Sequence, residues 1–235
     1  MFTRVRQDAL SGCYLIMEWD AIRNRARADL VISTERGDED MFLWEHSCRV
    51  AQNANRISML PEVQSAQPDT LAVVAGALYH DAAWIGRIAS GEVQRNEVLT
   101  ASVADNHSEQ SARILEESLS RLLPADSLQC ASYAIRTIGA RDSDSIEGQI
   151  ITDANELEEF GGISLWTTIR RGVSEGKGVQ AVLDMWRRRY EFRFWEARLN
   201  KAFRFDSVRE TARRRLELLE RFMAELEDQN KGADI

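Results

Sequence analysis

Apolar residues recur every three or four positions along most of this chain, which is the period of a helix with one buried face. The alternation of apolar and polar residues that is typical of a half-buried strand is almost absent, and only three prolines interrupt 235 residues. The pattern therefore predicts an all-α fold. The expected helices span residues 8–30, 40–60, 69–89, 106–122, 126–139, 145–160, 162–173, 178–202 and 206–228.

Polar segments that contain glycine separate several of these helices. Residues 33–40 and 90–105 are expected to form loops, and residues 174–178 a turn. No linker or low-complexity tract divides the chain. The sequence therefore predicts one helical domain over residues 1–235, with a charged helical flank over about residues 178–230.

The flank contains a run of aromatic and basic residues between positions 186 and 195. Nucleic-acid binding, by base stacking and phosphate contacts, is one interpretation of such a run. Acidic residues interrupt it, however, and Trp186, Tyr190 and Phe194 share one row of a helix. We therefore expect the flank to pack over the core or to form the contact face of a homodimer.

Composition and charge narrow the class of protein. Hydrophobic residues make up 44% of the chain and charged residues 29%, as in a globular protein. The longest apolar stretch, residues 71–78, is too short to span a bilayer, and the N-terminus lacks a secretory signal pattern, so we expect a cytoplasmic protein. The net charge of −8 argues against broad binding of nucleic acid or anionic membranes.

Four polar residues interrupt apolar stripes where burial is costly. His46 lies in the same helical row as Val50, Asp153 lies in a similar row, and the pair His80-Asp81 ends an apolar segment. Taken singly, a buried histidine is more often a hydrogen-bonded core residue than a ligand, and a buried aspartate often caps a helix or pairs with arginine. Together, two imidazoles and two carboxylates form a mixed nitrogen and oxygen set that suits Mn²⁺, Fe²⁺, Co²⁺, Ni²⁺, Zn²⁺ or Mg²⁺.

The order of these residues also resembles a known signature. His46, then His80-Asp81, then Asp153 is similar to the H…HD…D pattern of the HD-domain metal-dependent phosphohydrolase superfamily. Four segments carry the resemblance in the same order, namely HSCRVA at 46–51, ALYHD at 77–81, NHSEQSA at 106–112 and DANELEEFG at 153–161. The similarity covers about residues 40–165.

The resemblance implies a compact HD-like helical core and one divalent metal ion. The implied metal ligands are His46, His80, Asp81 and Asp153. A metal-bound water would then cleave the phosphate ester of a small metabolite, and nucleotide-like molecules are among the expected substrates.

The resemblance also implies roles for residues around the metal. Asp81 and His107 are the expected catalytic residues, with His107 protonating the leaving group or binding phosphate. Arg49 and Arg136, together with His107, are the expected substrate-binding residues. For Arg49, a surface ion pair or a packing contact is an equally good interpretation.

Three positions depart from the superfamily pattern and keep other functions open. Ile138 stands where two-metal members carry a second additional histidine, which weakens an alternative reading as an iron oxygenase. Trp84 replaces the glutamate that activates water in a nucleotidase branch, and Asn155 replaces the second acid of its motif. A regulatory module that binds metal or ligand without turnover is therefore a further alternative.

Overall fold

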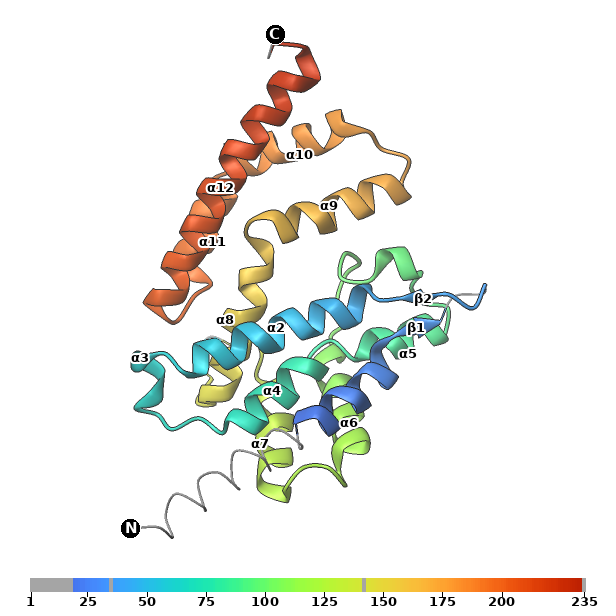
Figure 1. Ribbon diagram of the computed structural model, residues 1–235, viewed down its shortest axis with the longest axis vertical. Helices are drawn as coiled ribbons and strands as arrows, with labels where there is room; N and C mark the ends of the chain where they lie inside the picture. The colour runs from blue at the N-terminus through green and yellow to red at the C-terminus, as the bar shows by residue number, and fades with distance from the viewer. Residues whose placement is uncertain (1–18, 34–35, 141–142, 234–235) are drawn as a thin grey trace, which may run out of the picture.

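The computed structural model describes residues 19–33, 36–140 and 143–233, and over these residues the fold is all-α, as predicted (Figure 1). Residues 19–30 are helical, whereas residues 8–18 of the first expected helix lie outside the described residues. A short antiparallel ribbon follows, in which β1 (Ile32–Ser33) pairs with β2 (Glu39–Asp40). Apart from Ile32, this ribbon lies within residues 33–40, which were expected to form a loop.

Helix α4 (Thr70–Tyr79) forms the centre of the fold and packs against α2 (Phe42–Ser58) and α8 (Ile146–Glu156). Every residue from Leu71 to Tyr79 is buried, because this stretch is almost wholly apolar. Asp69 begins the helix, and its side chain accepts hydrogen bonds from the backbone N–H groups of Leu71 and Ala72. The short helix α3 (Pro61–Gln64) connects α2 to this centre.

A hairpin of α6 (His107–Leu119) and α7 (Ala125–Arg136) covers another side of α4. Gly76 allows the close contact, because a Cβ atom there would lie 2.8 Å from Cδ1 of Ile151 and 3.4 Å from the carbonyl oxygen of Ala131. Helices α4, α7 and α8 therefore meet at a position where a larger side chain would push them apart.

The helix expected over residues 69–89 is broken into two. Helix α4 ends at Tyr79 and α5 (Ala83–Ala89) begins after three intervening residues, so His80 and Asp81 lie in the turn between them. Hydrophobic periodicity does not reveal this break, because the apolar pattern continues through it. The expected loop over residues 90–105 contains one short element, η1 (Arg95–Glu97).

The C-terminal third continues from α8 through η2 (Leu157–Glu159), α9 (Gly162–Ser174), α10 (Val179–Glu191), α11 (Phe194–Lys201) and α12 (Asp206–Lys231). The helix expected over residues 178–202 is thus interrupted, and Arg193 at the break has a left-handed backbone with φ of 51°. None of the described helices has the length and the apolar character that a membrane span needs.

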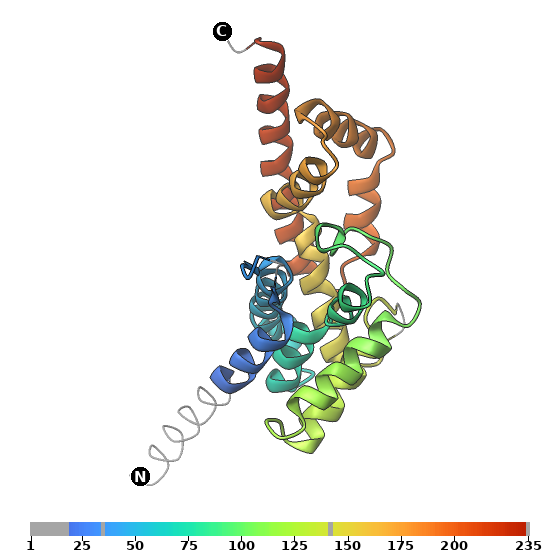
Figure 2. The same ribbon diagram turned by 90° about the vertical axis from the view of Figure 1, so that its right-hand side faces the viewer.

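The flank packs in two ways along its length. The first half of α12 joins the main core through Val208, Ala212 and Leu216. Its second half packs on α10 through Leu183, Leu219 and Met223, which form a separate small cluster. Figures 1 and 2 show that α9, α10 and this half of α12 extend beyond the bundle as an arm.

Candidate metal centre and its cavity

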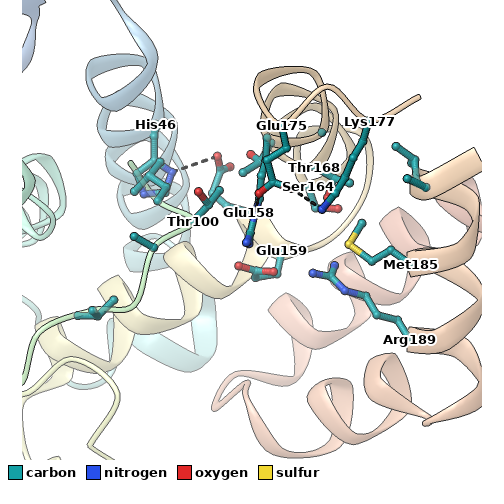
Figure 3. A pocket seen from close by; sticks show the side chains of 18 of the residues that line it. His46, Thr100, Glu158, Glu159, Ser164, Thr168, Glu175, Lys177, Met185 and Arg189 are labelled. Atoms are coloured by element: carbon teal, nitrogen blue, oxygen red, sulfur yellow. Dashed lines mark hydrogen bonds and ion pairs between the residues drawn. The ribbon is translucent and has the colours of Figure 1, made fainter. Parts of the chain in front are cut away.

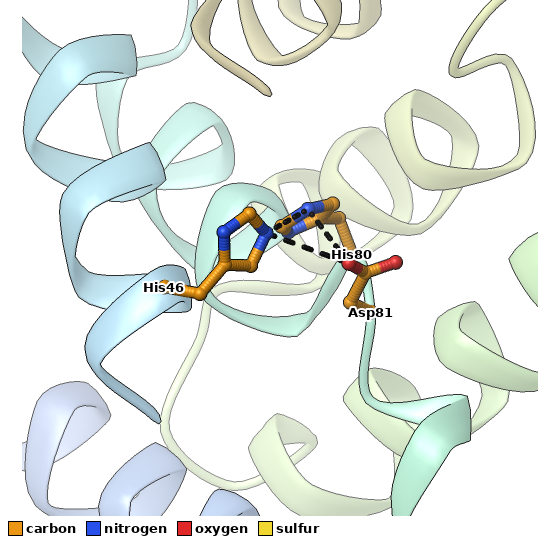
Figure 4. A group of neighbouring side chains, drawn as sticks. All are labelled: His46, His80 and Asp81. Carbon is orange, nitrogen blue, oxygen red and sulfur yellow. Dashed lines mark hydrogen bonds and ion pairs between the residues drawn. The ribbon is translucent and has the colours of Figure 1, made fainter. Parts of the chain in front are cut away.

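Three of the predicted metal ligands meet in the interior. His46 points inward from α2, and its Nε2 lies 3.3 Å from Nε2 of His80 (Figure 4). Asp81 Oδ2 lies 3.5 Å from His46 Nε2 and 3.4 Å from His80 Nε2. One ligand atom from each residue lies within 4.8 Å of the others, and within the described residues no other group of this kind is present.

The chemistry and orientation of this group fit a divalent cation. Donor atoms that are each about 2.0–2.2 Å from a metal ion lie about 3 Å apart, close to the spacing seen here. His80 Nδ1 is 2.8 Å from the carbonyl oxygen of Ala77, and a proton on Nδ1 that is donated to this oxygen leaves the lone pair of Nε2 facing His46 and Asp81. Two imidazole nitrogens therefore face one another beside a carboxylate, and a cation between them would use all three.

The charge states of the cluster follow from burial and from its neighbours. Burial disfavours the charged form of His46, but Asp81 and Glu158 outweigh this effect and raise the pKa of His46. Burial lowers the pKa of His80. Burial also favours neutral Asp81, yet the adjacent His80 and the hydrogen bond from His107 hold the pKa of Asp81 well below its usual range. A neutral His80 beside an ionised Asp81 is the state that binds metal.

His107 contacts the carboxylate oxygen of Asp81 that does not face His46 and His80. Its Nε2 donates to Oδ1 of Asp81 at 2.9 Å, and its ring contacts the edge of Trp84 at a centroid distance of 5.2 Å. His107 is buried and is not among the residues that line the cavity described below. The structure therefore places His107 where it would orient a metal ligand and not at the cavity surface, and its contact with substrate stays a prediction.

Asp153, the expected fourth ligand, lies apart from this group. Its fully buried carboxylate accepts hydrogen bonds from the backbone N–H of Arg204 at 3.1 and 3.0 Å and from that of Phe205 at 3.0 Å. Burial raises the pKa of Asp153 to about 6 even though these bonds favour the charged form. Asp153 therefore holds the turn between α11 and α12, and the structure does not bring it into the group of His46, His80 and Asp81; its role as a metal ligand stays a prediction.

Helix geometry explains why Asp153 points elsewhere. Two residues along a helix differ in direction by about 200°, so Asp153 and Asn155 occupy nearly opposite faces. Asn155 lines the cavity beside His46, together with Glu158 one turn further on. Glu158 Oε2 lies 3.6 Å from His46 Nδ1 and accepts a hydrogen bond of 2.7 Å from Nε of Arg49. The cavity-facing positions of this segment are therefore 155, 158 and 159.

The two predicted substrate-binding arginines lie in different surroundings. Arg49 is half-buried beside the cluster and is held by Glu158, in a pocket of about 280 Å³ that adjoins the main cavity. Arg136 is on the surface of α7, where it pairs with Glu109 at 2.7 Å and Glu116 at 3.0 Å. Arg136 lines neither pocket, so the structure does not bring it to the cluster, and its role in substrate binding stays a prediction.

A cavity of about 680 Å³ opens beside the cluster, between the core and the arm (Figure 3). His46, Asp81 and Trp84 form its inner end, and residues 99–101 form part of one side. Its outer wall comes from α9, α10 and the segment between them, and it carries hydroxyl, basic and acidic side chains, including those of Ser164, Thr167, Thr168, Arg171, Glu175, Lys177, Asp184, Arg188 and Arg189. Sequence reasoning missed this wall, because nothing local to positions 164–189 indicates that they approach His46.

Comparison with known proteins agrees with this architecture. Residues 43–159 match the family model of the HD domain. Among solved structures, Bacillus subtilis YpgQ in complex with ADP is similar with a TM-score of 0.57 and 19% identity, over 94% of this chain and 98% of that one. A predicted HD superfamily hydrolase from an uncultured Thermotogales bacterium has a TM-score of 0.52 and 20% identity, over 88% and 91% of the two chains. No curated protein matches the sequence.

The chain therefore belongs to the HD-domain family, through residues 43–159. The matched region contains the three clustered residues and ends at Glu159, just before α9. The arm that forms the outer wall of the cavity lies beyond it.

Proposed function

We propose that this chain is a metal-dependent phosphohydrolase that cleaves the phosphate ester of a small, nucleotide-like metabolite. The observation that carries the proposal is that the cluster of His46, His80 and Asp81 opens through His46 and Asp81 into a cavity of about 680 Å³. A volume in this range suits a drug-sized or cofactor-sized molecule.

Hydrogen bonds at the inner end of the cavity hold the candidate metal ligands in an orientation that suits metal-dependent hydrolysis. A divalent cation bound by the cluster would lower the pKa of a bound water and neutralise charge on a phosphate group. His80 is oriented by the carbonyl oxygen of Ala77, and Asp81 by Nε2 of His107. Buried Trp84 excludes water from the wall beside them. Such fixed orientation lets a metal site act without rearrangement.

The outer wall supports a polar, anionic substrate. Hydroxyl groups of Ser164 and Thr168 face the cavity and can bind sugar or base edges. Arg189 of α10 suits phosphate, because it is not paired with a carboxylate as Arg171 is. The similarity to YpgQ, whose structure contains ADP, also favours a nucleotide.

A phosphate-release panel tests the proposal. The protein is purified without added metal, its metal content is measured, and Mn²⁺, Co²⁺ or Mg²⁺ is added with nucleoside and sugar phosphates. We expect about one metal per chain and turnover of at least one nucleotide, lost on chelation and restored by metal. Metal-loaded protein that binds nucleotide but releases no phosphate from any member of the panel would refute hydrolysis.

A second candidate is a module that binds metal and ligand without turnover. Trp84 favours it, because this almost completely buried ring lines the cavity at the position, three residues after Asp81, where a water-activating glutamate was expected in a nucleotidase. Nucleotide binding with a persistent lack of phosphate release would support this candidate over the first.

The iron-oxygenase alternative finds less support. It needs two metal ions, and the described residues contain one group of three candidate ligands. Ile138 is only partly buried and packs against the core where a further histidine would be needed. Two iron atoms per chain in the purified protein would restore this alternative.

A further inference from the structure

Arg189 is the feature of the cavity that the metal cluster does not explain. It lies on α10, and its guanidinium group points into the cavity toward the side on which Glu159 lies (Figure 3). The guanidinium group lies 5.1 Å from the ring centroid of Phe194 and 5.5 Å from that of Trp195. Within the described part of the chain it makes no hydrogen bond and no ion pair.

Comparison with other partly buried arginines shows that this state is unusual in this protein. Arg170 donates to Asp40 at 2.9 Å, and Arg215 donates to the carbonyl oxygen of Leu157 at 3.0 Å. Arg189 is buried to a similar degree, and burial lowers its pKa as it does for the other two. A guanidinium group has five N–H donors and remains charged in proteins, so partial burial without an acceptor carries an energetic cost.

The acidic side chains around Arg189 do not neutralise it, so its guanidinium group is available to bind an anion. Arg171 pairs with Glu175 at 2.8 Å, and Lys177 pairs with the same carboxylate. Glu158, near the cluster, is already held by Arg49. Glu159 attracts Arg189 but does not reach it to form an ion pair. The aromatic support fixes the guanidinium group while its N–H donors face open space.

We propose that Arg189 binds a second phosphoryl group of the substrate, in addition to the one at the metal cluster. This inference rests on the proposed function and makes it more specific, because it selects substrates that carry two phosphoryl groups, such as a nucleoside diphosphate, over monophosphates. Arginine recognises phosphate through two parallel hydrogen bonds, which an ammonium group cannot reproduce. Residue 189 lies outside the matched HD domain at 43–159, so this selectivity belongs to the arm.

Equilibrium binding of AMP and ADP tests the inference without requiring turnover. These ligands differ by one phosphoryl group, so the ratio of their dissociation constants isolates the second anionic site. The wild type is expected to prefer ADP, and Arg189→Ala to weaken ADP binding about tenfold or more while changing AMP binding less than about twofold. Arg189→Lys should recover only part of the loss. Arg221→Ala, an exposed arginine of α12, is the control for net charge.

Glu159→Gln separates anion binding from a purely structural role. If Arg189 binds phosphate, removing the opposing carboxylate strengthens ADP binding by about two- to threefold. If Arg189 serves instead to attract Glu159 and close the cavity, Glu159→Gln weakens ADP binding as Arg189→Ala does, and the inference fails. Thermal unfolding of both variants checks that they remain folded.

Two outcomes overturn the inference directly. One is an equal loss of AMP and ADP affinity in Arg189→Ala, and the other is no loss for either. A wild type that binds neither nucleotide overturns it for nucleotides as well. Selective loss of ADP binding in a protein that releases no phosphate would uphold the role of Arg189 while refuting hydrolysis, so failures of the two proposals are distinguishable.

Discussion

Two aspartates, one partly buried in the turn after α4 and one fully buried on α8, show how differently the same side chain is used in this molecule. Asp81 faces the imidazoles of His46 and His80, and its pKa lies well below its usual range. Asp153 faces the backbone N–H groups of Arg204 and Phe205, and its pKa is raised to about 6. A polar residue in an apolar stripe must find a partner, but its position in the stripe does not say which partner.

Asp81→Ala gives the largest expected effect. The substitution removes the carboxylate from the cluster, so we expect the metal affinity to fall more than about a hundredfold and metal-dependent activity to disappear. Calorimetric titration with Mn²⁺ measures the affinity. Asp126→Ala, an exposed acidic residue in the first turn of α7, is the control and should bind metal as the wild type does. Full metal occupancy in Asp81→Ala would remove the distinction between the two aspartates.

Asp153→Ala is expected to act on stability and not on metal binding. It leaves the N–H groups of Arg204 and Phe205 buried without an acceptor, so the free energy of unfolding should fall by about 3–4 kcal/mol. Urea denaturation measures the fall, and metal titration of the folded fraction should give the wild-type affinity. Loss of metal with little loss of stability would instead make Asp153 a ligand.

The pH dependence of stability provides a second measure of Asp153. Because its pKa is raised from 3.8 to about 6, the folded protein holds this proton more tightly than the unfolded chain does. The contribution to stability is complete below about pH 4 and is lost as the pH rises to about 6, by about 3 kcal/mol. Asp153→Asn should lack this step when its unfolding free energy is compared with that of the wild type across the range. Parallel profiles for the two proteins would contradict the raised pKa.

His107→Ala has the smallest expected effect of the four. His107 donates to Asp81 and does not line the cavity, so its loss should weaken metal binding by about 10- to 100-fold and leave the KM for substrate nearly unchanged once metal is saturating. His107→Asn, which can donate through its amide, should recover part of the affinity. A large rise in KM at saturating metal would show that His107 contacts substrate after all.

The fold was largely predictable because the local pattern of apolar residues indicates which face of each helix is buried. The apolar rows through Leu43, Val50 and Ile150 predict which faces are buried, and the structure confirms that all three residues are fully buried. The breaks at residues 80–82 and 192–193 were not predictable, since the apolar pattern continues through the first and the helix-forming composition through the second. Both breaks matter for the candidate site. Asp81 lies in the first break, and the aromatic residues that contact Arg189 directly follow the second.

The sequence by itself determined the all-α class, the HD-domain family and three of the residues that cluster, since these follow from periodicity and from the local segments around His46 and His80-Asp81. Only the tertiary structure decided that Asp153 holds a turn, that His107 donates to Asp81, and that α10 brings Arg189 to the cavity. The physical reason is that burial is encoded along one helix at a time, whereas the partner of a buried polar group depends on contacts between segments far apart in the chain.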